Sequence, residues 1–336
     1  MAITLSGTVY STTWLEANGG DAVVRPWGWV YDSVNDKLYL SGMYNNINNP
    51  AWYKWRVISD LSTAPAGADW TLSSTPTPAL ASGDILNEGG NGMALAGDYI
   101  YFLQFRGSDT GAAAQRVNLT RIAVGTGVVE YAAEQFKISD AAYSFKGPAR
   151  GFAVVGSVCY VVLWDVSGAT WKLVTWSIAG LTWQASSPSN SQAVAGMVAA
   201  TASRTLTLYV ADGSFPAGMT LTNDGNLTVW YDAANKVEKY APADLAYIGF
   251  GDWTSGANVG SMYYDGSNLW ELDRSIATGA DHTVYVVGYT DGSSAVIDES
   301  RCSVELEARP ALVGEVTPLA ITVTLRDGFG SPMASL

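Results

Sequence analysis

The sequence predicts an all-β protein made of repeated units of about 55 to 60 residues. Apolar and polar residues alternate along many short segments, which is the pattern of half-buried strands. The 13 Trp, 18 Tyr and 35 Gly suit strands that are separated by tight turns. The apolar spacing of an amphipathic helix is almost missing, and residues 132 to 142 are the nearest candidate for a helix.

One hairpin pattern recurs along the chain. A small or apolar strand leads through a turn containing Gly, Asn or Asp into a strand centred on an aromatic residue or another β-former. Strong copies begin at Gly28, Gly92 and Gly151, and weaker copies begin at Gly196 and Gly260. The second strands align on Tyr39, Tyr101, Tyr160, Thr207 and Trp270. The intervals between these residues are about 60 residues, except for a shorter one before Thr207.

Each copy continues into a second hairpin, which would complete a four-stranded sheet. These continuations begin at Tyr53, Asn118, Lys172, Asn223 and His282. In the second and third copies, turns at residues 125–127 and 179–180 would reverse the third strand into the outermost one. A Gly at the start of each innermost strand would let crowded backbones approach one another.

This repeat resembles the blades of β-propeller proteins across residues 27 to 298. The resemblance is to an architecture, because the WD40 signature needs a Gly-His and a Trp-Asp pair in each blade and the chain has a single His. It implies about five four-stranded blades within residues 1–299, with an N-terminal strand at residues 2–10 closing the ring in the last blade. A β-sandwich array, or a ring of six or seven blades, remains the alternative.

Residues 300–336 differ in character from the repeats and form a separate C-terminal β segment. Strict alternation from Ile321 to Leu325, followed by Arg326-Asp327-Gly328-Phe329-Gly330-Ser331-Pro332, resembles the early strands of bacterial immunoglobulin-like domains of invasin and intimin type. The segment is therefore either the start of such a module or a pair of strands at the edge of the propeller.

Composition limits the partners and cofactors. The net charge of −13 repels phosphate backbones, so we expect no nucleic-acid partner. The first residues lack a basic region followed by an apolar one, and no apolar run of about 18 residues occurs, so we expect neither a signal peptide nor membrane insertion. One His and two distant Cys predict no disulfide framework, no transition-metal site and no cofactor.

The sequence predicts no enzyme, although a propeller-type glycoside hydrolase stays an alternative. Such an enzyme needs two nearby carboxyl groups. The acidic residues near the inner hairpins are Asp32, Asp98, Asp165 and Asp252. Asp32 and Asp98 occur at turns, where Asp is favoured for backbone reasons. Residues 223–226 and 265–268 offer oxygen ligands for calcium, but they equally favour hairpin turns.

Aromatic and amide side chains in loops are the best candidates for ligand binding. Aromatic faces stack on sugar rings while amides bind sugar hydroxyls, although most Trp residues pack blades together. The candidates are Tyr44, Asn46, Trp52, Tyr53, Phe105, Trp164 and Trp253.

By analogy of fold, we expect a structural or attachment component of an extracellular assembly, foremost a bacteriophage tail or fibre accessory protein. Its location would be the virion or the extracellular space, reached without a signal peptide. Its partners would be other virion or surface-assembly proteins in a multi-copy arrangement, and cell-surface glycans. A glycan-binding adhesin or lectin is the second hypothesis.

Overall fold

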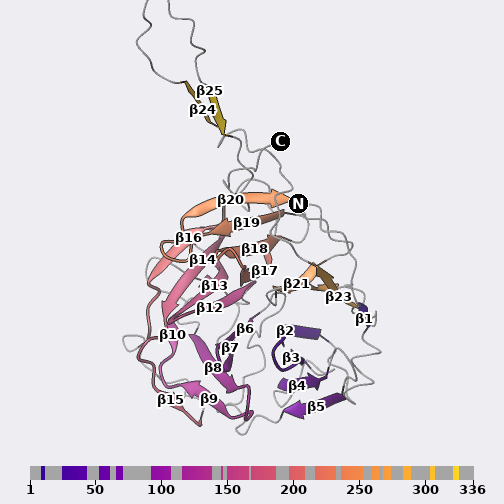
Figure 1. Cartoon of the computed structure of the whole chain (residues 1–336). Coiled ribbons are helices and arrows are strands. Elements are labelled where there is room, and N and C mark those ends of the chain that lie inside the picture. Colours follow the sequence, from indigo (N-terminus) through magenta and orange to yellow (C-terminus); the bar gives the residue numbers. More distant parts are fainter. Residues whose placement is uncertain are drawn as a thin grey trace, which may run out of the picture.

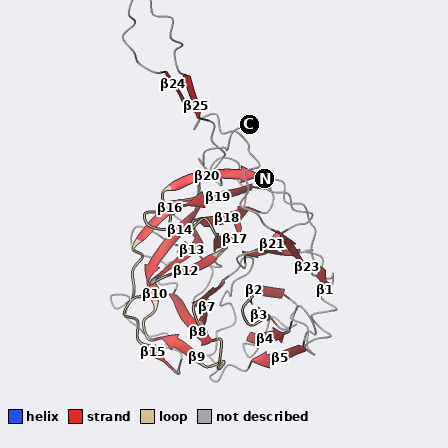
Figure 2. Cartoon of the chain, in the orientation of Figure 1, coloured by secondary structure: helices blue, strands red, loops and turns tan. Residues whose placement is uncertain are grey.

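The structure is a computed structural model, and nearly all of the residues it describes are in strands or tight turns (Figure 2). The described residues are 9–11, 25–43, 53–60, 66–70, 92–106, 116–137, 145–146, 150–165, 168–186, 197–208, 216–231, 236–252, 259–264, 268–273, 283–288, 303–306 and 321–324.

Five antiparallel sheets of at least four strands make up the body of the described chain. Sheet 1 contains β2 (Arg25–Asp32), β3 (Lys37–Met43), β4 (Tyr53–Ser59) and β5 (Ala66–Trp70). Sheet 2 contains β6 (Met93–Ala96), β7 (Tyr99–Arg106), β8 (Arg116–Ala123) and β9 (Val129–Ala132). Sheet 3 contains β12 (Phe152–Val155), β13 (Val158–Asp165), β14 (Thr170–Ser177) and β16 (Ala202–Thr205).

Sheet 4 contains β17 (Pro216–Leu221), β18 (Leu227–Tyr231), β19 (Lys236–Tyr240) and β20 (Tyr247–Asp252). Sheet 5 contains β21 (Val259–Tyr264), β22 (Asn268–Asp273), β23 (Thr283–Gly288) and β1 (Val9–Ser11). Short strands add to sheets 2 and 3, namely β10 (Phe136–Lys137), β11 (Phe145–Lys146) and β15 (Trp183–Gln184).

The first strands of the five sheets form a closed ring. β2 contacts β6, β6 contacts β12, β12 contacts β17, β17 contacts β21, and β21 contacts β2. Figure 1 shows these strands around the centre, with β5, β9, β16 and β20 toward the rim. The structure therefore confirms the predicted all-β class and its propeller-like arrangement of small sheets, rather than a β-sandwich array.

Four of the five predicted inner hairpins are correct. The copies at Gly28, Gly92, Gly151 and Gly260 correspond to β2–β3, β6–β7, β12–β13 and β21–β22. Strands such as β12 and β13 are apolar and almost fully buried because neighbouring sheets cover both of their faces. The candidate helix is wrong, since residues 132–137 contain the end of β9, a turn and β10.

The fourth predicted hairpin, from Gly196, is wrong. β16 within this segment is the outer strand of sheet 3, and its residues 202–204 are exposed. The inner hairpin of sheet 4 is instead β17–β18, whose residues are almost all buried. The prediction assigned residues 223–232 to an outer hairpin, and the short interval before Thr207 was the sign of this error.

The predicted outermost strand of the third unit is also misplaced. β15 pairs with β9 of sheet 2, and not with β14. The guanidinium of Arg121 lies between two rings, 4.2 Å from the centre of Tyr99 and 4.0 Å from that of Trp183. Cation–π contacts and the ladder bonds thus hold a connection from sheet 3 against the outer edge of sheet 2.

The two ends of the chain join different sheets. β1 pairs with β23, so the fourth strand of sheet 5 comes from the N-terminal part of the chain. β24 (Ser303–Leu306) and β25 (Ile321–Thr324) form a two-stranded sheet that lies apart from the ring in Figure 1. The strand expected at 321–325 is therefore present, while the immunoglobulin-like module and the domain boundary at residue 299 stay predictions.

Inner strands approach each other closely where sheets 3 and 4 meet. A Cβ on Gly151 would lie 2.5 Å from Cβ of Met219 and 2.7 Å from its backbone nitrogen. Both distances are too short for a methyl group at Gly151. The backbone of β17 cannot rotate away from it as a side chain could. At this position the predicted role of glycine, close approach of inner strands, holds.

We therefore expect Gly151→Ala to lower the free energy of unfolding by about 1 to 3 kcal/mol, because the added methyl must push two inner strands apart. Urea unfolding followed by Trp fluorescence measures this loss. Gly125→Ala is the matched control, since a Cβ there meets no atom within 4 Å. Equal stability of the two variants would contradict close packing at Gly151.

Candidate functional site

A cavity of about 300 Å³ lies on the axis of the ring, at the end where the inner strands turn into their second strands. All five inner strands contribute to its wall. The lining residues are Tyr31, Asp32, Ser33, Val34, Met93, Ala94, Leu95, Phe152, Ala153, Val154, Thr220, Leu221, Tyr263 and Tyr264.

Sheets 2 and 3 supply an apolar half of the cavity wall. Every lining residue from β6 and β12 is apolar, and Met93 and Phe152 are the largest of the buried ones. Both strands end in two-residue turns that begin with a glycine of positive φ, Gly97 at 57° and Gly156 at 58°. These tight turns leave only strand residues to line the cavity on this side.

Sheets 1, 4 and 5 supply the polar half. Its hydrogen-bonding side chains are Tyr31, Asp32, Ser33, Thr220, Tyr263 and Tyr264. Sheets 1 and 4 have longer turns, at residues 33–36 and 222–226. β17, β21 and β2 are consecutive in the ring, so the polar groups form one continuous side opposite the apolar one.

The carboxylate of Asp32 organises the turn at the edge of this polar half. Its Oδ1 accepts hydrogen bonds from the backbone N–H of Val34 at 3.0 Å and of Asn35 at 3.2 Å, and its Oδ2 accepts one from Asn35 Nδ2 at 2.6 Å. Asp32 is only 5% exposed, and its charge together with burial raises the pKa of Tyr39 to about 12, burial being the larger cause. A negative charge is thus fixed beside the cavity.

Two tyrosines tie the polar half together. The hydroxyl of Tyr31 donates to Asp36 at 2.7 Å, and the hydroxyl of Tyr263 donates to the carbonyl oxygen of Tyr31 at 3.3 Å. The second bond joins sheet 5 to sheet 1. The side of the cavity that carries the polar groups is therefore held in place before any ligand arrives.

The four aspartates considered for glycoside hydrolysis are not brought together as a set. Asp32 lines the cavity, whereas Asp98 is exposed in the β6–β7 turn and Asp252 ends β20. Asp165 ends β13, about 25 Å along the strand from the β12–β13 turn. Its carboxylate lies 2.8 Å from Lys172 Nζ in a buried ion pair. Among the described lining residues, Asp32 is the one carboxylate.

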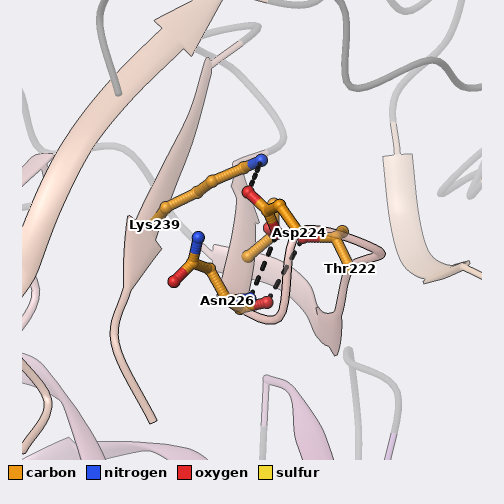
Figure 3. Close-up of polar contacts among 5 residues, drawn as sticks. Thr222, Asp224, Asn226 and Lys239 are labelled. Carbon is orange, nitrogen blue, oxygen red and sulfur yellow. Dashed lines mark hydrogen bonds and ion pairs between the residues drawn. The ribbon is translucent and has the colours of Figure 1, made fainter. Parts of the chain in front are cut away.

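The turn considered for calcium is held by a protein ammonium group (Figure 3). Asp224 accepts hydrogen bonds from the hydroxyl of Thr222 at 2.7 Å and the backbone N–H of Asn226 at 3.1 Å, and it pairs with Lys239 at 2.6 Å. The arrangement is the hairpin turn that the sequence favoured. The other candidate, residues 265–268, lies outside the described residues except for Asn268, which begins β22.

Glu238 is a buried acid with a structural role. Burial raises its pKa, against hydrogen bonds that lower it, including those from the Tyr231 hydroxyl and from the backbone N–H of Leu208 at 2.9 Å. The Tyr240 hydroxyl accepts a hydrogen bond from the Thr207 N–H at 3.1 Å. Glu238 therefore fastens the connection after β16 onto sheet 4, away from the residues that line the cavity.

The predicted binding residues fall on several elements. Tyr44, Asn46, Trp52 and Trp253 lie outside the described residues, Tyr53 begins β4, and Phe105 lies on β7. Trp164 lies on β13, with its ring 5.4 Å from that of Trp171 in an edge-to-face contact. Sequence reasoning overlooked Tyr31, Thr220 and Tyr263, although their place just before the inner turns of the repeat could have identified them.

The described residues contain neither a metal-binding cluster nor a membrane-spanning helix. No group of three or more His, Cys, Asp or Glu side chains there could hold a metal ion. No helix in the same residues has the length and apolar character needed to cross a membrane.

Known proteins resemble this chain in structure only. No protein-family model and no curated protein sequence matches it. A luciferin-regenerating enzyme shares 12% identity over 85% of this chain and 96% of its own, with a TM-score of 0.44. A glucose dehydrogenase shares 12% identity over 82% and 83%, with a TM-score of 0.42. A β-propeller domain from Myceliophteria thermophila shares 10% identity over 81% and 68%, with a TM-score of 0.38.

These comparisons correct one prediction. The expectation of a non-enzyme is contradicted, because two of the structures named above are enzymes. At 10 to 12% identity and TM-scores below 0.5, they provide no reaction for this chain. Any functional assignment has to come from the cavity itself.

The Asp224 turn yields a test of stability. Burial opposes its ionisation, but hydrogen bonds from Lys239, Asn226 and Thr222 and the charge of Lys239 prevail, and they lower its pKa from 3.8 to about 2. A lowered folded pKa stabilises the fold above the unfolded pKa and loses this effect as the pH falls through about 2.

We expect Asp224→Asn to lower the free energy of unfolding by about 2 kcal/mol at neutral pH, because it leaves the 2% exposed Lys239 ammonium without its carboxylate. The difference from the wild type should shrink as the pH falls from 4 toward 2. Urea titrations across this range measure it, with Asp98→Asn as an exposed-turn control. A deficit that does not depend on pH would contradict the ion-pair explanation.

Proposed function

We propose that this protein is an attachment component of an extracellular assembly, and that it holds a sugar ring of a cell-surface glycan in the axial cavity. The observation that supports the proposal is the division of one cavity into an apolar half and a polar half. A sugar ring has the same division, with C–H groups on its faces and hydroxyl groups around its edge.

Each half of the cavity offers a different kind of contact to such a ligand. Leu95, Val154 and the neighbouring aliphatic residues can cover the C–H face. Asp32 has two acceptor oxygens, and Ser33 and Thr220 have hydroxyls that both donate and accept. Fixed polar groups beside an apolar wall are typical of small-molecule sites.

Size and access agree with this proposal. A volume of about 300 Å³ is at the lower limit of ordinary ligand sites, so it suits one ring and not an extended chain. Ser33 is exposed and Val34 is 90% exposed, yet both line the cavity. The cavity therefore opens to solvent beside the β2–β3 turn, where the end of a glycan can enter.

An attachment role explains how a single small sugar site could be useful. One sugar in one cavity binds weakly, but several copies on one particle multiply the effect through effective concentration. The expectation of a multi-copy phage tail or fibre protein fits this scheme, and it stays a prediction from composition and analogy of fold.

Blocking the mouth of the cavity tests the proposal. We expect Ser33→Trp to reduce binding to an immobilised glycan array by tenfold or more, since an indole at the entrance occupies the volume that a sugar needs. Ser157→Trp is the matched control, because Ser157 is exposed in the β12–β13 turn and does not line the cavity. If no glycan binds to the wild type, or if both variants bind equally well, the cavity is not a sugar site.

A further inference from the structure

We propose that Asp32 makes the axial cavity select neutral and amino sugars against acidic sugars. This inference rests on the proposed function and adds the chemical class of its ligand. It makes Asp32 a specificity-determining residue, because its carboxylate is part of the cavity wall that a ligand meets.

The described residues of the cavity wall carry charge of one sign only, and that sign is negative. Asp32 contributes a carboxylate, and no Lys, Arg or His is among the described residues that line the cavity. Lys37 pairs with Asp32 in the β2–β3 register, but it lies on β3 and outside the lining set. The groups that hydrogen-bond to the carboxylate are N–H groups of Val34 and Asn35, which are neutral and leave its charge in place.

Burial makes this charge effective. Asp32 is 5% exposed, so little water screens it on the protein side. The other polar side chains among the described lining residues carry hydroxyls, which can bind a neutral sugar and cannot neutralise a second carboxylate. The net charge of −13 adds a repulsive field at longer range. An acidic sugar would therefore bring its carboxylate to a negative, partly dry site whose described lining residues include no cation to pair with it.

The test compares sugars that differ at one carbon. Glucose and galactose have a hydroxymethyl group where glucuronic and galacturonic acid have a carboxylate, and glucosamine has an ammonium group in place of the hydroxyl on carbon 2. Calorimetric titration of the whole chain with these monosaccharides gives the affinity of each. We expect each uronic acid to bind at least about tenfold more weakly than its parent hexose, and glucosamine to bind at least as tightly as glucose.

Two substitutions assign the effect to one residue. Asp32→Asn removes the charge and keeps an oxygen that can accept the N–H bonds of the turn. We expect Asp32→Asn to reduce the difference in affinity between a hexose and its uronic acid to about threefold or less. Asp98→Asn removes the same charge at an exposed turn outside the cavity wall. It should leave the difference in affinity between hexose and uronic acid unchanged.

The possible results separate this inference from the proposed function. If uronic acids bind the wild type as tightly as hexoses, or if both variants change the difference in affinity equally, the role of Asp32 is wrong while the sugar site remains. If none of the sugars binds the wild type, the sugar site is wrong and the inference falls with it.

Discussion

Closure of the inner ring is the constraint on which the rest of this structure depends. A single four-stranded sheet of this kind has two faces to cover, and each sheet here covers a face of the next. The contact between β12 and β17 shows how tightly this is done, because Met219 occupies the space that a side chain on Gly151 would need. Completing sheet 5 with β1 joins the N-terminal part of the chain to the last repeat. The axial cavity exists only because all five inner strands are present.

The repeat is regular in its strands and irregular in its turns, and the irregularity determines the character of the cavity. Sheets 2 and 3 turn in two residues with glycine at positive φ, and their lining residues are apolar. The longer turns of sheets 1 and 4 place Ser33 at the mouth and are each held by an aspartate. A ring with five equivalent walls would be uniformly apolar or uniformly polar at its axis. Because the turns differ in length, the axial cavity of this ring has an apolar half and a polar half.

Sequence reasoning predicted the elements whose signal is local. The hairpins at Gly28, Gly92 and Gly151 combine buried β-formers with recognisable turns, and all three are present. It failed where pairing depends on another sheet. Residues 202–205 form a strand only because the edge of β14 is available, and Trp183 pairs with β9 because Arg121 and Tyr101 contact its ring. Such partners leave no periodic trace in their own segment.

The candidate site was predicted less well than the fold, for a related reason. Loop aromatics such as Trp52 attract attention by residue type alone, and Trp164 has the ordinary role of packing against Trp171. Tyr31, Thr220 and Tyr263 are unremarkable strand residues until the ring brings their ends to one axis. Asp32 was considered, but only as a turn former or as one of a catalytic pair. A site made from the ends of five separate repeats has no sequence motif, because its spacing is that of the repeat itself.

Asp32 and Asp224 show how one local motif can serve two purposes. Each carboxylate accepts the N–H of the residue two positions ahead, Val34 in one case and Asn226 in the other, so each stabilises its own turn. The difference lies in the cation. Lys239 reaches Asp224 at 2.6 Å and neutralises it, whereas the hydrogen-bond donors to Asp32 are neutral groups. The Asp224 turn is therefore complete within the protein, while no ion pair to Asp32 is found in the described part of the chain, so its charge is available to a ligand in the cavity.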